Sequence, residues 1–196
     1  LKSAGFVSSS LIRSQNALNI AYILYLKLKS LKYDSGLIES YVRRWFVLSI
    51  LTGRYSGSPE SVIDFDVKNI SSKDFKEYLK SIENAELSQA FWEFGLIQNL
   101  DTSVSSSPNF NVFLASQVKF LDKGFLSKDI SVSDMITHRG DIHHKFPKDY
   151  LKKKGIKRNK YNQIANYVYM QTEINIQVGN KSPKVYFEEL LKQCDG

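Results

Sequence analysis

The chain has 196 residues, of which 42% are hydrophobic and 24% are charged, a composition that is ordinary for one globular domain. Its formal net charge of +7 favours a polyanionic partner, although a basic solvated surface would give the same balance. The single cysteine, Cys194, excludes a disulfide within the chain, and the most apolar run, residues 17–26, is too short to cross a membrane.

These features predict a protein of the cytoplasm with no membrane partner. No signal peptide is visible, and the lack of a disulfide framework fits a reducing compartment. The first residue is Leu rather than Met, as expected of a fragment of a longer protein.

Hydrophobic periodicity predicts a mostly helical body over residues 1–135. Apolar residues recur at spacings of three and four, and breaks fall at Gly- and Ser-rich stretches. The expected helices cover residues 17–31, 37–48, 59–68, 72–82, 87–100 and 110–121, with Ser8 to Ser10 offering caps before the first of them. A Ser-rich loop, residues 101–108, is the expected mobile link. Gly53 to Gly57 fits a structural turn better than a phosphate cradle, because it lacks the strand and helix on either side that a P-loop needs.

The region after residue 135 differs in both pattern and charge. From His138 to the end there are 12 Lys and Arg against 6 Asp and Glu, whereas the first 137 residues hold 15 against 14. Such a skew is typical of a surface that binds a phosphate backbone.

Two adjacent histidines, His143 and His144, open this region in a short segment that Pro147 closes. In an extended segment neighbouring side chains face opposite ways, so the two histidines are expected to have different jobs. Residues 166–170 favour a second strand, and Thr172 to Gly179 a short helix with Asn175 on its first turn. Pro183 begins an expected last helix through Leu191. The predicted fold class is therefore mainly α with a small ββα unit in residues 136–196, an α+β arrangement.

Three runs of sequence carry a resemblance to a known family: His143-His144-x-Phe146-Pro147, Ile164-Ala165-Asn166-Tyr167-Val168, and Asn175-Ile176-x-x-Gly179-x-Lys181-Ser182-Pro183. They resemble the HNH, or ββα-metal, nuclease motif, and more closely the C-terminal nuclease region of the DUF262/DUF1524 proteins, a family that includes modification-dependent (type IV) restriction endonucleases. Family-like helical sequence such as Trp45 to Ser49 extends the resemblance over most of the chain.

The resemblance implies a role for each site residue. His143 would be a metal ligand, His144 the general base, Asn166 the residue that braces the hairpin, and Asn175 the second ligand. Asp141 would be a third ligand or a partner that orients a histidine, with a solvated strand end as the alternative. Many HNH proteins carry Asp or Glu at the position of His143 and His at that of Asn175, so the ligand set here is more neutral.

The implied function is hydrolysis of DNA phosphodiester bonds in restriction or phage defence, with one divalent cation, Mg²⁺ or Mn²⁺, and with Zn²⁺ or Ni²⁺ as ions that a crystal would also accept. The family's N-terminal DUF262 domain would be a partner within a longer chain. The residues expected to contact nucleic acid are basic, a solvated helix face being the alternative for the lysine run: Lys145, Lys152, Lys153, Lys154, Lys157, Arg158, Lys160 and Lys181. Two other interpretations remain open: a non-catalytic nucleic-acid-binding module with a relic or structural metal site, and a metal-dependent RNase.

Overall fold

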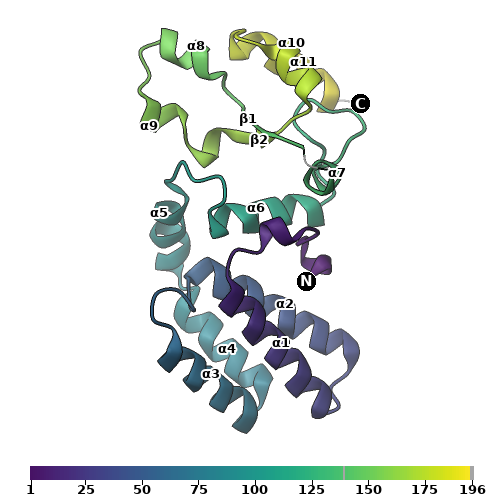
Figure 1. Ribbon diagram of the computed structural model, residues 1–196, viewed down its shortest axis with the longest axis vertical. Coiled ribbons are helices and arrows are strands. Elements are labelled where there is room, and N and C mark those ends of the chain that lie inside the picture. Colours follow the sequence, from purple (N-terminus) through teal and green to yellow (C-terminus); the bar gives the residue numbers. More distant parts are fainter. Residues whose placement is uncertain (139, 195–196) are drawn as a thin grey trace.

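The computed structural model describes residues 1–138 and 140–194, without the side chains of 189, 190, 193 and 194. The protein is mainly helical, with one small antiparallel sheet in the C-terminal third (Figure 1). Of the basic residues counted in the C-terminal region, Arg139 lies outside the described residues. No helix in the described ranges has the length and apolarity needed to cross a bilayer.

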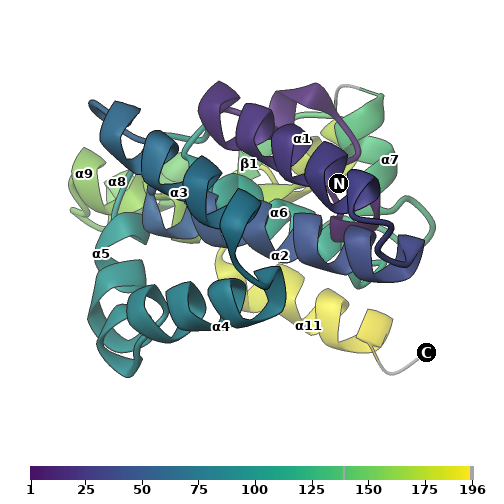
Figure 2. The same ribbon diagram turned by 90° about the horizontal axis from the view of Figure 1, so that it is seen from below.

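Four helices form the lower part of the molecule: α1 (Gln15–Ser30), α2 (Ser35–Thr52), α3 (Glu60–Ser72) and α4 (Phe75–Glu86). Helix α2 runs through the middle of this group (Figure 2). Its Trp45 and Phe46 are completely buried. It begins where Asp34 accepts hydrogen bonds from the first backbone amides, and it ends at Gly53 with φ 65°, the left-handed conformation that glycine adopts without strain. The prediction that the protein is mainly helical is thus confirmed.

The turn after α2 is structural, as its sequence suggested. Asp66 of α3 is fully buried and accepts hydrogen bonds from Arg54, Tyr55 and Tyr78. Arg54 also pairs with Glu86 of α4. One buried carboxylate therefore joins the turn to α3 and α4, with every oxygen partnered.

A second group of helices connects this body to the C-terminal region. A π-helical turn (Phe91–Gly95) runs into α5 (Leu96–Leu100), and a loop leads to α6 (Pro108–Lys119) and α7 (Val132–Thr137). Helix α6 packs on α2 and α7, and its Phe110 and Leu114 belong to the main core. Two short 3-10 turns (Lys2–Ala4 and Ser9–Leu11) pack against α6, so Ser8 to Ser10 do not cap α1; Ser14 caps it.

The sheet pairs β1 (Ile142–His144) with β2 (Tyr167–Tyr169), and α10 (Thr172–Val178) follows directly. Between the strands the chain makes an excursion through two short helices, α8 (Lys148–Lys153) and α9 (Arg158–Tyr161), which the sequence did not predict. Helix α11 (Pro183–Cys194) ends the described chain. The sheet lies between two cores: Ile142, Tyr167 and Tyr169 pack on the main core, and Val168 packs with Met170, Val178 and Tyr186 beneath α10 and α11.

Candidate functional site

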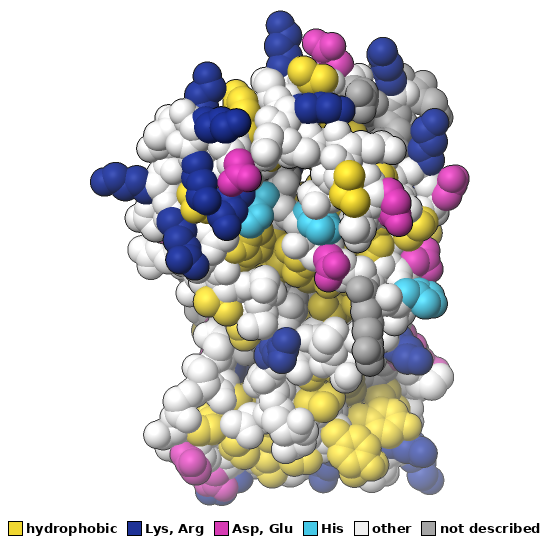
Figure 3. Space-filling view, turned by 45° about the horizontal axis from the view of Figure 1, so that its top comes forward, with side chains coloured by type: hydrophobic (Ala, Val, Ile, Leu, Met, Phe, Trp, Pro, Cys, Tyr) yellow, Lys and Arg dark blue, Asp and Glu magenta, His cyan; other side chains and the backbone are white. Residues whose placement is uncertain are grey.

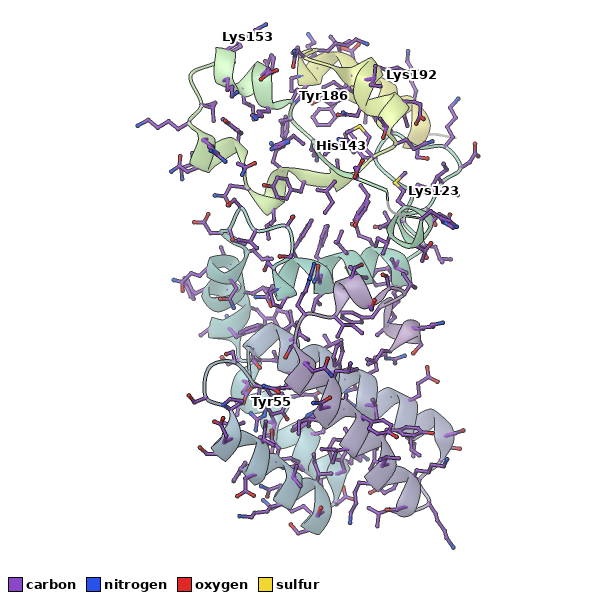
Figure 4. The ribbon with its side chains drawn as sticks, in the orientation of Figure 1. Tyr55, Lys123, His143, Lys153, Tyr186 and Lys192 are labelled. Atoms are coloured by element: carbon purple, nitrogen blue, oxygen red, sulfur yellow. The ribbon has the colours of Figure 1, made fainter. Side chains whose placement is uncertain are left out.

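The two histidines face opposite sides of the sheet. His143 stands opposite Val168, which packs toward α10 and α11, while His144 stands opposite Tyr167, which packs toward the body. Figure 4 places His143 between the strands and the α10–α11 pair. The alternation expected from an extended segment is therefore present, and each histidine has its own surroundings.

A hollow of about 360 Å³ nevertheless brings both histidines together with α10. The residues lining it come from β1, the start of α8, and α10 with the turn after it: Ile142, His143, His144, Pro147, Lys148, Asp149, Asn175, Ile176, Gly179 and Asn180. Three of the residues expected at the site, His143, His144 and Asn175, thus share one surface depression, although 31 positions separate His144 from Asn175 in the chain.

The Nε2 atom of His143 is buried and has no hydrogen-bond partner among the described residues. A buried polar atom without a partner costs about 1–3 kcal/mol, so such atoms are uncommon in folded proteins and call for an explanation. An imidazole nitrogen is a good ligand for a divalent transition metal, and the Asn175 side chain in the same hollow carries an oxygen donor. The hollow therefore contains two donor types that divalent cations accept.

His144 has the surroundings of a neutral imidazole. Its Nε2 lies 3.2 Å from Oδ1 of Asn162, and its ring packs edge-on against Tyr167 at 5.4 Å. Burial lowers the pKa of His144 from its ordinary value of 6.5, an effect that the hydrogen bond with Asn162 opposes and the nearby positive charge of Lys148 reinforces. In the tautomer in which Nε2 donates to Asn162, Nδ1 keeps a lone pair and can accept a proton at neutral pH.

Asn166 makes the hydrogen bonds expected of a brace. Its Oδ1 accepts from the Phe146 amide at 2.7 Å, and its Nδ2 donates to the carbonyl oxygens of Phe146 and Tyr161 at 3.2 and 2.9 Å. Its own carbonyl accepts from the Lys145 amide. The prediction that Asn166 is a strand residue was wrong: it ends a 3-10 turn (Ile164–Asn166) directly before β2, and from this turn its side chain bonds to the backbone of Phe146 and Tyr161.

Asp141, the carboxylate expected to help bind metal, is exposed and is not among the residues that line the hollow. It precedes β1, and its charge acts on Tyr169, where burial, and then Asp141, raises the pKa of the phenol. No three His, Cys, Asp or Glu side chains within the described ranges stand close enough together to hold a metal.

Lys145 does not line the hollow either. Its Nζ lies 5.4 Å from the ring centre of Phe187, 5.8 Å from that of Phe146 and 6.0 Å from that of Phe125. Tyr186, whose pKa burial raises to about 12, donates a hydrogen bond to the Lys145 carbonyl. The Lys145 side chain therefore lies over the rings that hold α11, where cation–π attraction stabilises it.

The remaining basic residues lie on the excursion between the strands. Every residue from Lys152 to Lys160 is exposed, and five lysines and one arginine fall among them. Their one ion pair within the described part of the chain joins Lys152 to Asp149 at 3.6 Å. Figure 3 shows most of the Lys and Arg side chains on this face gathered over the upper part of the molecule, around two histidines, and few over the helical body. Lys181 is exposed beyond the end of α10 and lines a different hollow with Lys128.

Several residues at the site were not predicted from the sequence: Lys148, Asp149, Asn162 beside His144, and Asn180. A signal existed for Lys148 and Asp149, because a proline directly after the histidine segment marks the start of a helix whose first turn must lie beside that segment. For Asn162 the sequence offers no comparable signal, since its contact depends on how the excursion folds back.

The chain is similar to an uncharacterized protein, MJ0686, from Methanocaldococcus jannaschii, with 27% identity over 164 residues. The match covers 83% of this chain and 27% of that protein, so the chain spans about a quarter of its relative's length. No protein-family model matches the chain, and no solved structure matches it. The description of the relative names no activity, so the chemistry of the site has to be argued from the residues themselves.

Proposed function

We propose that this chain carries an HNH-type endonuclease that uses one divalent cation, Mg²⁺ or Mn²⁺, to hydrolyse phosphodiester bonds in DNA. One observation carries the proposal: the buried, unpartnered Nε2 of His143 belongs to a histidine that shares its hollow with Asn175 and with the second histidine, His144. The order of elements, strand, strand and helix with donors on the first and last, supports the same assignment.

Each residue of the site has a role in this proposal. His143 and Asn175 hold the cation, which when bound supplies positive charge to the phosphate and to the leaving oxygen. His144 accepts the proton of the attacking water, a task for which its lowered pKa leaves it unprotonated at neutral pH. Lys148, at the rim of the hollow, neutralises a phosphate oxygen. Asn166 keeps the segment after the histidines in place.

DNA is the proposed substrate because the excursion beside the hollow is exposed and basic. A single strand and a duplex would both meet positive charge there, because the phosphates of either are attracted to exposed Lys and Arg side chains. The setting in restriction or phage defence, the cytoplasmic location and a DUF262 partner domain rest on the family resemblance and are part of the proposal.

The experiment is a nicking assay on supercoiled plasmid with Mg²⁺, with Mn²⁺ and with EDTA. We expect nicked or linear product with either ion and none with EDTA. The control variant is His138→Ala, which removes an exposed histidine directly after α7, outside the hollow; it should cut like the wild type. Retarded migration of intact plasmid without cleavage under every condition would favour the non-catalytic binding module instead, and cleavage of an RNA strand alone would favour the RNase.

A further inference from the structure

The hollow contains a carboxylate that the family resemblance does not assign. Among the described residues that line it, Asp149 is the one acidic side chain. Pro147 precedes α8 immediately after the histidine segment, so the chain turns back and the first turn of α8, which carries Asp149, borders the hollow. Asp141, two residues before His143, acts on Tyr169 instead.

A cation in this hollow needs negative charge nearby. The two donors, an imidazole nitrogen and an amide oxygen, are both neutral, whereas Mg²⁺ and Mn²⁺ prefer oxygen ligands and are usually bound with at least one carboxylate. Mg²⁺ also keeps several of its water ligands when it binds a protein. A carboxylate that cannot reach the ion directly can therefore still stabilise it by accepting hydrogen bonds from those waters.

The surroundings of Asp149 leave it available for this role. Its one ion-pair partner in the described chain, Lys152, stands 3.6 Å away, beyond hydrogen-bond distance, and both side chains are about half exposed. Asp149 does not form a compact group of three with the histidines. A contact with the cation through water does not require such a group.

We propose that Asp149 is a positioning residue that holds water ligands of the cation bound by His143 and Asn175. The inference rests on the metal site of the proposed function and adds to it the negative charge that the two neutral donors lack. It also replaces Asp141 with Asp149 as the acidic member of the site.

The test measures Mn²⁺ binding to the full chain by isothermal titration calorimetry, without DNA. Asp149→Asn removes the charge and keeps the shape, and Asp141→Asn is the matched control because it makes the same change outside the hollow. Loss of a carboxylate that acts through bound water weakens metal affinity by about 10–100-fold. We expect that loss in Asp149→Asn, affinity like the wild type in Asp141→Asn, and no measurable binding in His143→Ala.

A second readout separates a role at the metal from a role in the fold. Asp149 is exposed, so thermal unfolding of Asp149→Asn should match the wild type. Its nicking rate should be low at limiting Mn²⁺ and recover at saturating Mn²⁺, because the defect lies in affinity.

The possible results have distinct meanings. Wild-type Mn²⁺ affinity in Asp149→Asn, together with lost binding in His143→Ala, would overturn the role of Asp149 and leave the metal site standing. Equal weakening in Asp149→Asn and Asp141→Asn would also overturn it, since the effect would then be one of net charge. If His143→Ala binds Mn²⁺ like the wild type, the metal site itself is wrong and the proposed function fails with it.

Discussion

Two polar clusters in this protein differ in whether their buried polar atoms have hydrogen-bond partners. Around Asp66 the carboxylate is fully buried and every partner is present: an arginine, two tyrosine hydroxyls and a second acid on α4. Around His143 the polar atom is buried and unpartnered within the described residues, and the cluster opens to solvent through the hollow. Where every buried polar atom has a protein partner, the cluster stabilises the fold and has no free atom for a ligand. Where one such atom lacks a partner, it can bind a ligand from solution.

The sharpest way to test this contrast is to remove the base. His144→Ala should reduce nicking by about 10²–10⁴-fold, the usual contribution of a general base, while Mn²⁺ and DNA affinities stay close to those of the wild type. Nicking rates, calorimetry and gel retardation on one preparation would provide the comparison, with His138→Ala as the control. If His144→Ala cuts normally while His143→Ala binds metal normally and is inactive, the two histidines have exchanged roles.

Mutations in the cluster around Asp66 should change the free energy of unfolding and should not change the nicking chemistry. Asp66→Asn leaves Arg54 buried with less compensating charge, and removing one partner of a buried pair costs about 3–5 kcal/mol of unfolding free energy. Urea unfolding would measure the loss. Asp64→Asn is the matched control on the same helix, because Asp64 makes only an exposed pair with Lys68, worth about 0.3–0.5 kcal/mol. Equal stability of the two variants would mean that the cluster around Asp66 does not hold the helices together.

Asn166 shares features of both clusters. It is 7% exposed and its side-chain amide is hydrogen-bonded, as in the cluster around Asp66, and it also holds the segment that carries the histidines. Asn166→Ala should lower the free energy of unfolding by about 1–3 kcal/mol, because the Phe146 amide loses its acceptor. Its nicking rate should fall by more than the unfolded fraction explains. Asn166→Asp should also be poor, as a carboxylate cannot donate to Phe146 and Tyr161. Full activity with unaltered unfolding in Asn166→Ala would remove the middle residue from the HNH assignment.

The smallest of these effects concerns DNA affinity. Replacing Lys152, Lys153 and Lys154 with Gln should flatten the dependence of DNA affinity on salt, with the log–log slope falling by about 0.9 for each phosphate that the protein no longer neutralises. The control is the triple replacement of Lys27, Lys29 and Lys32 with Gln at the far end of the body, which should leave the slope unchanged. The same slope in both triple variants would assign the α8–α9 lysines to a solvated surface.

The order of the longer helices and of the two strands was predictable because apolar spacing and the four prolines mark it locally. Every proline lies at the start of a helix or one residue before it, at 59, 108, 147 and 183. The partners of Asp66 could not be predicted, because a buried acid is recognised only after α3 and α4 have packed on the turn. Helices α7, α8 and α9 were missed since each has at most six residues, too few for periodicity to appear.

At the site, local geometry was predictable and side-chain placement was not. The opposite facing of His143 and His144 follows from any extended backbone. The placement of Asp149 rather than Asp141 in the hollow depends on the turn at Pro147. Lys145 was expected to contact nucleic acid, and its position away from the hollow depends on three rings that come together from separate parts of the chain.

The hydrogen bonds of Asn166 have one more consequence, for how readily this protein can change its specificity. They tie the Phe146 end of the excursion to its return before β2, so the excursion is anchored at its base and its exposed stretch, residues 152–160, can vary without disturbing the sheet. Lengthening a flexible loop is inexpensive, at about 0.6 kcal/mol for each doubling. We therefore expect a four-residue Gly-Ser insertion after Gly155, an exposed turn with φ 75°, to leave the melting temperature nearly unchanged and to alter DNA affinity alone. A large fall in melting temperature would show that α8 and α9 support the fold. If they do not, substrate preference can diverge in this segment while the histidines keep their chemistry.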